Sequence, residues 1–198
     1  MATGDGDDSV AILSATNGAD WVNEFRVATG AGNDVVVIGP FDVAGAAAAG
    51  DATFANTAFG AGAFAPDDAA TLSFVDLGAG DDVFIGRGSS RDVVRGGAGD
   101  DLFLAGRGDD TLEGGAGHDR FVFGSGDGQD TILDFAPTAR GGAAADHLTL
   151  RGFGIPALQA ILAAAVQDGA DTVLHYGEDS VRLVGVGKAE LALQDLLF

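Results

Sequence analysis

Cysteine is absent from the 198 residues of this sequence. A disulfide framework and a cysteine-based zinc site are therefore both excluded. Basic residues are also scarce, since 10 Lys and Arg stand against 30 Asp and Glu and give a net charge of −20. Because nucleic acids and anionic membranes are themselves negative, this charge argues against both as partners. A protein with this charge attracts cations.

Long apolar runs and catalytic motifs are missing as well. No apolar stretch reaches the roughly 18 residues of a membrane helix, and the N-terminus lacks the basic and apolar segments of a cleaved signal peptide. The sequence contains no HExxH, no Gly-x-Ser-x-Gly, no Walker loop and no complete GxGxxG, and its three histidines lie far apart. We therefore expect a protein that is not an enzyme and does not span a membrane.

Glycine, in contrast, is abundant, with 33 residues in the whole chain. In the middle of the chain, glycines recur with a period of nine. Three consecutive copies fill residues 96–122, with glycine at places one, two and four, Asp at place six and a large apolar residue at place eight; Ala105 is the one exception. Each copy leaves about three residues for a strand, which is too short to be stable alone. Successive copies must therefore stack.

Stacking places particular side chains together. If each nonapeptide turns the chain through half a coil, copies two repeats apart form parallel strands, and Phe103, Leu112 and Phe121 point inward from both sheets. Asp101 then lies under Asp119, and two stacked carboxylates repel each other unless a cation lies between them. Oxygen-only ligands select a hard cation, and a flexible oxygen cage favours Ca²⁺ over Mg²⁺.

The alternative is that Gly-Asp turns are simply good turn formers with solvated Asp side chains. Three consecutive copies in register argue against it. The copies resemble the calcium-binding nonapeptides of the RTX (repeats-in-toxin) family. This resemblance implies an all-β fold, a parallel β-roll, in which each calcium ion lies between two turns on the same edge.

The resemblance also implies the ligands of each ion. The lower turn gives the carbonyls of places two and four and its Asp, and the upper turn gives the carbonyls of places one and three and its Asp. Carried onto this sequence, one site comprises Gly97, Gly99 and Asp101 with Gly114, Ala116 and Asp119. A second site comprises Gly78, Gly80 and Asp82 with Gly96, Ala98 and Asp101.

Counting coils assigns further Asp residues to two edges of the roll. Asp82, Asp101 and Asp119 fall on one edge, and Asp92, Asp110 and Asp130 fall on the other. The second edge is the weaker one, because Asp92 lies in an irregular ten-residue unit where Arg91 could replace a cation. The remaining candidate ligands are Gly106, Gly108, Asp110 and Asp130 on the second edge, and Asp8 and Asp34, which wider N-terminal rungs place on one edge.

The sequence suggests three segments: an N-terminal wide-rung or irregular β segment at 1–76, the calcium roll at 77–135 and a small mixed cap at 136–198. A worn copy of the repeat lies at 17–22. Residues 40–72 are rich in Ala, Gly and Phe, which fits an insertion that loops out of the roll or further wide rungs. For their Phe residues, core filling is favoured over a cofactor pocket.

In the third segment we expect a helix at 155–166, with Pro156 in its first turn, and a hairpin formed by 172–176 and 180–184. Together these elements would cap the open end of the roll. Residues 189–198 are apolar at a helical spacing. They predict either a docked terminal helix or, beside an RTX array, a segment that resembles the uncleaved C-terminal signal of type I secretion, which we favour.

The sequence therefore predicts a secreted bacterial calcium-binding module that folds on Ca²⁺ outside the cell and is not catalytic. It would act in export and folding and as a surface, matrix or adhesin-type component, with calcium ions and the type I secretion machinery as partners. The alternative is the C-terminal RTX tail of a secreted protease, lipase or alginate epimerase whose catalytic domain lies outside this sequence.

Overall fold

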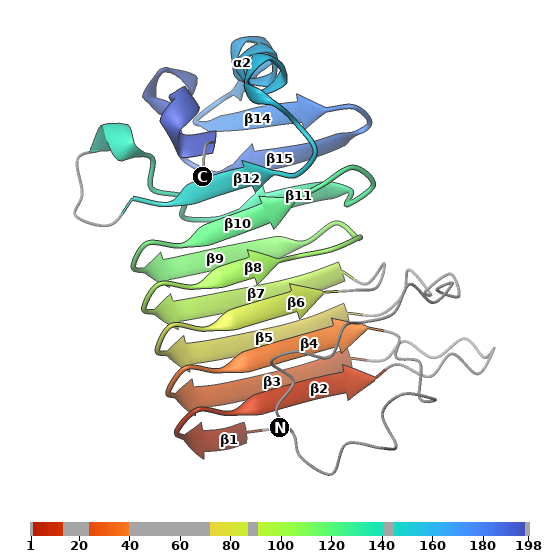
Figure 1. The fold of residues 1–198 in the computed structure, drawn as a ribbon, viewed down its shortest axis with the longest axis vertical. Coiled ribbons are helices and arrows are strands. Elements are labelled where there is room, and N and C mark those ends of the chain that lie inside the picture. The colour runs from red at the N-terminus through yellow and green to blue at the C-terminus, as the bar shows by residue number, and fades with distance from the viewer. Residues whose placement is uncertain (1, 14–23, 40–71, 87–90, 141–144, 197–198) are drawn as a thin grey trace, which may run out of the picture.

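The computed structural model describes residues 2–13, 24–39, 72–86, 91–140 and 145–196, which wind into a solenoid (Figure 1). In the described residues one sheet contains, in spatial order, β1 (Ala2–Asp5), β3 (Glu24–Ala31), β5 (Leu72–Ala79), β7 (Arg91–Ala98), β9 (Thr111–Ala116), β11 (Gln129–Ile132), β15 (Asp179–Leu183), β14 (Asp171–Tyr176) and β13 (Val166–Asp168). The other contains β12 (His147–Leu150), β10 (Arg120–Phe123), β8 (Leu102–Leu104), β6 (Val83–Gly86), β4 (Val35–Gly39) and β2 (Ser9–Leu13).

The strands of the roll pair in parallel with the strand one coil away, which confirms the parallel β-roll. β8 pairs with β10 through Phe103 and Phe121, and β7 pairs with β9 through Gly97 and Gly115. Both pairings join residues 18 apart, as two stacked nonapeptides require. The chain therefore alternates between the two sheets once in every repeat.

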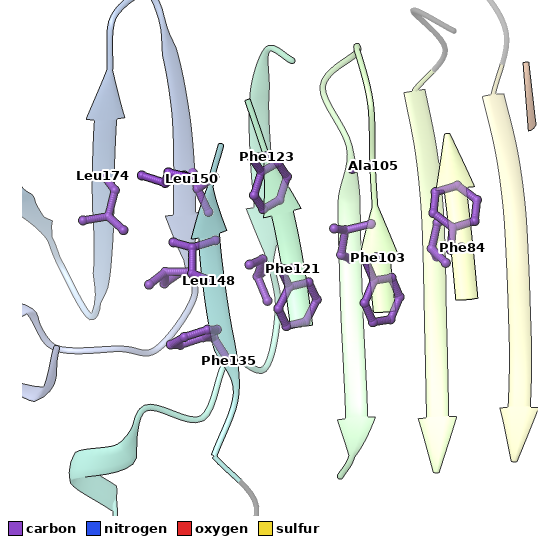
Figure 2. Packing of buried hydrophobic residues seen from close by; sticks show 14 of the residues in the cluster. Phe84, Phe103, Ala105, Phe121, Phe123, Phe135, Leu148, Leu150 and Leu174 are labelled. Carbon is purple, nitrogen blue, oxygen red and sulfur yellow. The ribbon is translucent and has the colours of Figure 1, made fainter. Parts of the chain in front are cut away.

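The core lies between the two sheets and is made by the place-eight residues. Phe103, Leu112 and Phe121 are fully buried, and the rings of Phe103 and Phe121 stack with their centroids 4.9 Å apart. Figure 2 shows Phe84, Phe103 and Phe121 in a row along successive coils. Burial of each aromatic side chain stabilises the roll by about 1.5–3 kcal/mol, so the repeat supplies its own core.

The strands differ in length between the two sheets. The expected stub of about three residues fits β8, which has 3 residues, but β7 has 8. β7 is longer because it continues into the turn, where Gly97 and Ala98 pair with Gly115 and Ala116. Gly115 has φ +104, and a Cβ on it would overlap the carbonyl oxygen of Gly97. Glycine at place two therefore permits the close approach of stacked turns.

The N-terminal coils join the same stack. The backbone N–H of Asp8 donates to Asp34 Oδ1 at 2.7 Å, so these two residues occupy successive coils on one edge, as the wide rungs predict. β3 pairs directly with β5, and β4 with β6, so no rung lies between these described strands. The interpretations of residues 17–22 and 40–71 fall outside the described residues.

The C-terminal cap contains the expected helix and hairpin. Helix α2 (Ile155–Ala164) buries Leu158 and Ile161 against the core and ends two residues before the expected boundary, because Val166 begins β13. β14 and β15 form the antiparallel hairpin, and β15 continues the roll by pairing in parallel with β11. In the described part of the chain, no helix is long and apolar enough to cross a membrane.

The C-terminal segment is docked, although not as an α-helix. It forms two 3-10 turns, η3 (Lys188–Glu190) and η4 (Leu193–Leu196), and it buries Leu191 and Leu196 in the core. The fully buried Asp195 carboxylate accepts hydrogen bonds from the N–H and hydroxyl of Thr138 at 3.0 and 2.7 Å. This segment therefore contributes to the cap. The division into three segments stays a prediction.

Candidate metal centre

Turns with the same Gly-x-Gly-x-Asp pattern stack on one edge of the roll, which we call the first edge. Their alignment follows from the strand pairs that join Gly4 to Gly30, Gly30 to Gly78, Gly78 to Gly97 and Gly97 to Gly115. Each turn ends in an Asp at place six, and these residues form a column: Asp8, Asp34, Asp82, Asp101 and Asp119. The structure thus brings together the Asp residues predicted for the first edge.

In this column, Asp34, Asp82, Asp101 and Asp119 each accept a backbone N–H from the coil below through Oδ1. The backbone N–H of Asp82 donates to Asp101 Oδ1 at 2.9 Å, and the N–H of Asp101 donates to Asp119 Oδ1 at 3.0 Å. The Oδ2 atoms have no hydrogen-bond partner in Asp8, Asp34, Asp82, Asp101 and Asp119. A buried polar atom without a partner costs about 1–3 kcal/mol. A column of such atoms calls for a cation.

Side chains at place five, one residue earlier, form a second column with the opposite properties. Asp81 and Asp100 are exposed, and the N–H of Asp100 donates to Asp81 Oδ1 at 2.8 Å. His118 continues this outer column and is exposed, as expected from its place. The outer carboxylates are therefore solvated, and only the inner column needs an ion.

Carbonyl oxygens approach the same gap between turns. The oxygens of Gly97 and Gly99 face the next turn, since a Cβ on Gly115 or Gly117 would overlap them. A Cβ on Gly96 would contact both Asp101 Oδ2 and the Gly114 carbonyl, so these two oxygens lie together. The carbonyls proposed as upper ligands at place three already accept a backbone N–H, that of Gly99 for Ala116 and that of Gly80 for Ala98, both at 2.8 Å.

The donor set fits calcium. In the described ranges, no three His, Cys, Asp or Glu side chains form a group that could hold a metal, so an ion here must combine two carboxylates with backbone oxygens. Calcium accepts six to eight such oxygens in flexible geometry. Which carbonyls coordinate it remains a prediction.

The second edge repeats the arrangement with a shorter column. The N–H of Asp92 donates to Asp110 Oδ1 at 2.8 Å, and the N–H of Asp110 donates to Asp130 Oδ1 at 3.0 Å. The Oδ2 atoms of Asp110 and Asp130 have no hydrogen-bond partner. The hypothesis that Arg91 replaces a cation is wrong, because adjacent residues of a strand point to opposite faces: Arg91 is exposed and Asp92 is buried.

The glycines predicted for the second edge also lie in this stack. The N–H of Gly108 donates to the Asp127 carbonyl at 2.7 Å, and a Cβ on Gly128 would overlap the carbonyl oxygen of Gly108. Gly106 has φ +83, a conformation that glycine adopts without strain. The turn below Asp130 therefore presents its backbone oxygens to the next coil, as on the first edge.

Sequence reasoning missed several acidic residues that end the columns. Asp146 tops the first column, where its Oδ1 accepts the N–H of Asp119 at 3.1 Å and its Oδ2 accepts that of Ala136 at 2.7 Å. Asp134 accepts the N–H groups of Gly114 and Gly115 at 2.9 and 2.8 Å. These residues follow the last regular repeat, so the nine-residue spacing could not place them.

Burial makes several carboxyl groups of the columns weaker acids than usual. It raises the pKa of Asp101 and Asp119 to about 7, with neighbouring carboxylates adding to the effect. It raises the pKa of Asp110 to about 9 and that of Asp130 to about 8. Without a bound cation, Asp101 and Asp119 on the first edge and Asp110 and Asp130 on the second therefore bind protons near neutral pH.

One comparison with known proteins, that with family models, agrees with this chemistry. The model of the RTX calcium-binding nonapeptide repeat family matches residues 87–121 and 95–132. Among solved structures, extracellular lipase LipA from Serratia marcescens aligns with 100% of this chain and 38% of its own, at 14% identity and a TM-score of 0.40. The chain thus spans 38% of the length of that lipase chain. No curated protein matches.

Proposed function

Because this chain is an RTX repeat protein whose nonapeptides bind Ca²⁺, we propose that it is a secreted module that folds on calcium outside the cell. The observation that carries the proposal is the set of Oδ2 atoms without a hydrogen-bond partner, in the first-edge column and in Asp110 and Asp130 on the second edge. A coil cannot stack on the next without bringing these oxygens together. Binding free energy for the ion is therefore also folding free energy.

The calcium concentration would then act as the folding signal. Extracellular calcium modules bind with dissociation constants of about 10⁻⁴–10⁻³ M, so low cytosolic calcium leaves the sites empty. The chain would stay unfolded inside the cell, which suits a channel that passes unfolded chains. It would fold where calcium is millimolar.

We propose a binding role and not a catalytic one. In each column, one carboxylate oxygen is held by the backbone of the neighbouring coil, as in the pair Asp82 and Asp101. The other oxygen faces the ion position between turns. Calcium binding therefore explains why the carboxylates are paired, and no catalytic role is needed for them. The module would act in export and as a surface, matrix or adhesin-type component.

The C-terminal segment would be read by a type I exporter before the chain folds. Leu191, Leu196 and Asp195 are buried in the folded protein, so an exporter can reach them only in an unfolded chain. Folding after export would then dock the segment onto the cap. Low calcium inside the cell would keep the segment accessible to the exporter. Calcium-induced folding outside the cell would then bury the segment in the cap.

Deletion of residues 189–198 should abolish secretion of the chain through a co-expressed type I system. The matched control is Asp195→Ala, which retains the segment and removes the acceptor for Thr138. It should weaken the folded cap and leave secretion unchanged, because export precedes folding. The measurement is the amount of protein in the medium against the amount in the cells. The export proposal fails if the truncated chain reaches the medium.

A further inference from the structure

Place one of the first-edge turns changes along the roll. The strand pairs align the residues at this place, which are Thr3, Thr29, Leu77, Gly96 and Gly114. Glycine at this place has no side chain, whereas threonine adds a hydroxyl. The two N-terminal turns therefore carry an oxygen atom that the regular repeats do not have.

The two hydroxyls lie between successive turns. Thr29 Oγ1 donates to the carbonyl oxygen of Leu77, one coil above, at 2.5 Å, and Thr3 Oγ1 donates to that of Thr29 at 2.7 Å. The Thr29 side chain is fully buried. The N–H of Asp34 crosses the same gap and donates to Asp82 Oδ1 at 2.5 Å. Thr29 and Asp34 therefore join the same two turns.

A side chain at place one is directed at the carboxylate of its own turn. In the regular repeats, a Cβ on Gly96 would overlap Asp101 Oδ2, and the next turn of this edge has the same arrangement. Thr29 occupies the same place in the turn that ends at Asp34. Its hydroxyl is therefore on the side of the turn where an ion between stacked carboxylates would lie.

The oxygens of this gap are used differently from those of the regular repeats. The Leu77 carbonyl is the place-one ligand that the family pattern gives to the upper turn, and here it already accepts the Thr29 hydroxyl. Asp34 is fully buried, and its Oδ2 has no hydrogen-bond partner. A hydroxyl that donates its proton keeps two lone pairs on its oxygen. The Thr29 oxygen is therefore able to coordinate a cation while it remains bonded to Leu77.

Backbone oxygens of the same turn also face this gap. A Cβ on Gly78 would overlap the carbonyl oxygen of Gly30, and a Cβ on Gly80 would overlap that of Gly32. The gap thus presents two carbonyl oxygens to an ion in addition to the carboxylates. Calcium accepts six to eight oxygen ligands, so a hydroxyl oxygen adds to this set without exceeding it.

We propose that the Thr29 hydroxyl is a calcium ligand in the gap between turns 29–34 and 77–82, next to the carboxylates of Asp34 and Asp82. The proposal rests on the proposed function for the identity of the ion. The hydroxyl would take the role that a backbone carbonyl has in the regular repeats. A turn without glycine at place one would then still hold its ion, and calcium would stack the N-terminal coils as it stacks the regular ones.

The test is Thr29→Val, which removes the hydroxyl and keeps the shape of the side chain, beside Thr29→Ser, which retains the hydroxyl. The matched control is Thr172→Val, because the buried Thr172 hydroxyl also donates to a carbonyl, that of Val186 at 2.7 Å, but lies in the cap hairpin. Calcium binding to the full chain is measured by calorimetry and by counting bound ions. Thr29→Val should lose one ion, or bind it at least roughly tenfold more weakly than Thr172→Val does. Thr29→Ser and Thr172→Val should bind as many ions as the wild type.

A purely structural hydroxyl gives a different result. Loss of its hydrogen bond would then destabilise Thr29→Val as it destabilises Thr172→Val, and the two variants would bind equal numbers of ions with equal affinity. That result overturns the inference and leaves the proposed function intact, as does an equal loss of the ion in Thr29→Ser. If the wild type neither binds calcium nor folds with it, the proposed function fails, and this site fails with it.

Discussion

In excess chelator at about pH 8, the purified chain should be largely unfolded, and millimolar calcium should restore the β-roll. Neighbouring strands lie about 4.8 Å apart, and two unit charges at that distance repel by about 3.5 kcal/mol at an effective dielectric constant of about 20. The first-edge column stacks several such carboxylates, whereas a domain is stable by only about 5–15 kcal/mol. Repulsion in the ion-free columns is therefore large enough to unfold the roll.

Far-ultraviolet circular dichroism measures this transition directly. Magnesium at the same concentration is the control, because Mg²⁺ demands tight octahedral geometry and gives up its water reluctantly. It should restore much less of the β signal than calcium does. A full β spectrum in chelator that calcium leaves unchanged would show that the columns are stable without an ion.

In the absence of calcium, acid should partly restore folding of the roll. Burial raises the folded-state pKa values of Asp110 and Asp130 to about 9 and 8, and that of Asp146 to about 6, from an ordinary value of 3.8. A group with a raised folded-state pKa stabilises the fold fully below its unfolded pKa, and this stabilisation is lost as pH rises through the folded pKa. The ion-free roll should therefore gain stability as pH falls from about 9 to about 5.

The size of this effect follows from the shifts. One pKa unit corresponds to about 1.4 kcal/mol, so a raised pKa at several buried carboxyl groups is a large effect beside the about 5–15 kcal/mol by which a domain is stable. Metal-free protein should show a β spectrum at about pH 5 and an unfolded one at about pH 8. Sedimentation velocity is the control against aggregation, because the sequence pI is about 4.1. An equally unfolded spectrum at both pH values would contradict the burial of these groups.

Protons and calcium should also compete. Because the same carboxylates bind both, the apparent dissociation constant of the folded roll for calcium should rise as pH falls from about 8 to about 6, although acid lowers the calcium concentration needed to fold the chain. A dissociation constant that is independent of pH would place the ion away from the columns.

The regular part of the fold could be predicted because the repeat specifies it locally. Place-eight residues such as Phe103 and Leu112 fix the inward face, and place-six residues such as Asp101 fix the edge. Each coil contacts only its neighbours, so one repeat and its period define the stack. Alignment of the repeat turns also predicted the wide coil that places Asp8 and Asp34 on one edge, as the hydrogen bond between them confirms.

The cap could not be predicted at the same level, because its contacts depend on tertiary packing. Asp146 joins the first column 27 residues after Asp119, a spacing unrelated to nine. Asp179 contacts the last turn of the second edge from a hairpin that carries no repeat. The short 3-10 turns near Leu191 form where their apolar side chains meet the core, whereas the helical spacing of residues 189–198 suggested a docked helix as the alternative to a secretion signal.

The central claim is that inner-column carboxylates, and not acidic side chains in general, hold the calcium that stacks the coils. Asp100 and Asp101 test it, because they are adjacent in sequence, yet Asp100 is exposed and Asp101 is buried. Asn retains the Oδ1 that accepts from His118 in one case and from Asp82 in the other. Only the charge and the second carboxylate oxygen are lost.

The measurement is a calcium titration of each variant, followed by circular dichroism and by counting bound ions. Asp101→Asn should raise the calcium concentration at the folding midpoint at least roughly tenfold and lower the number of bound ions, whereas Asp100→Asn should titrate like the wild type. Equal midpoints and equal ion counts for the two variants would contradict the assignment of calcium to the inner column.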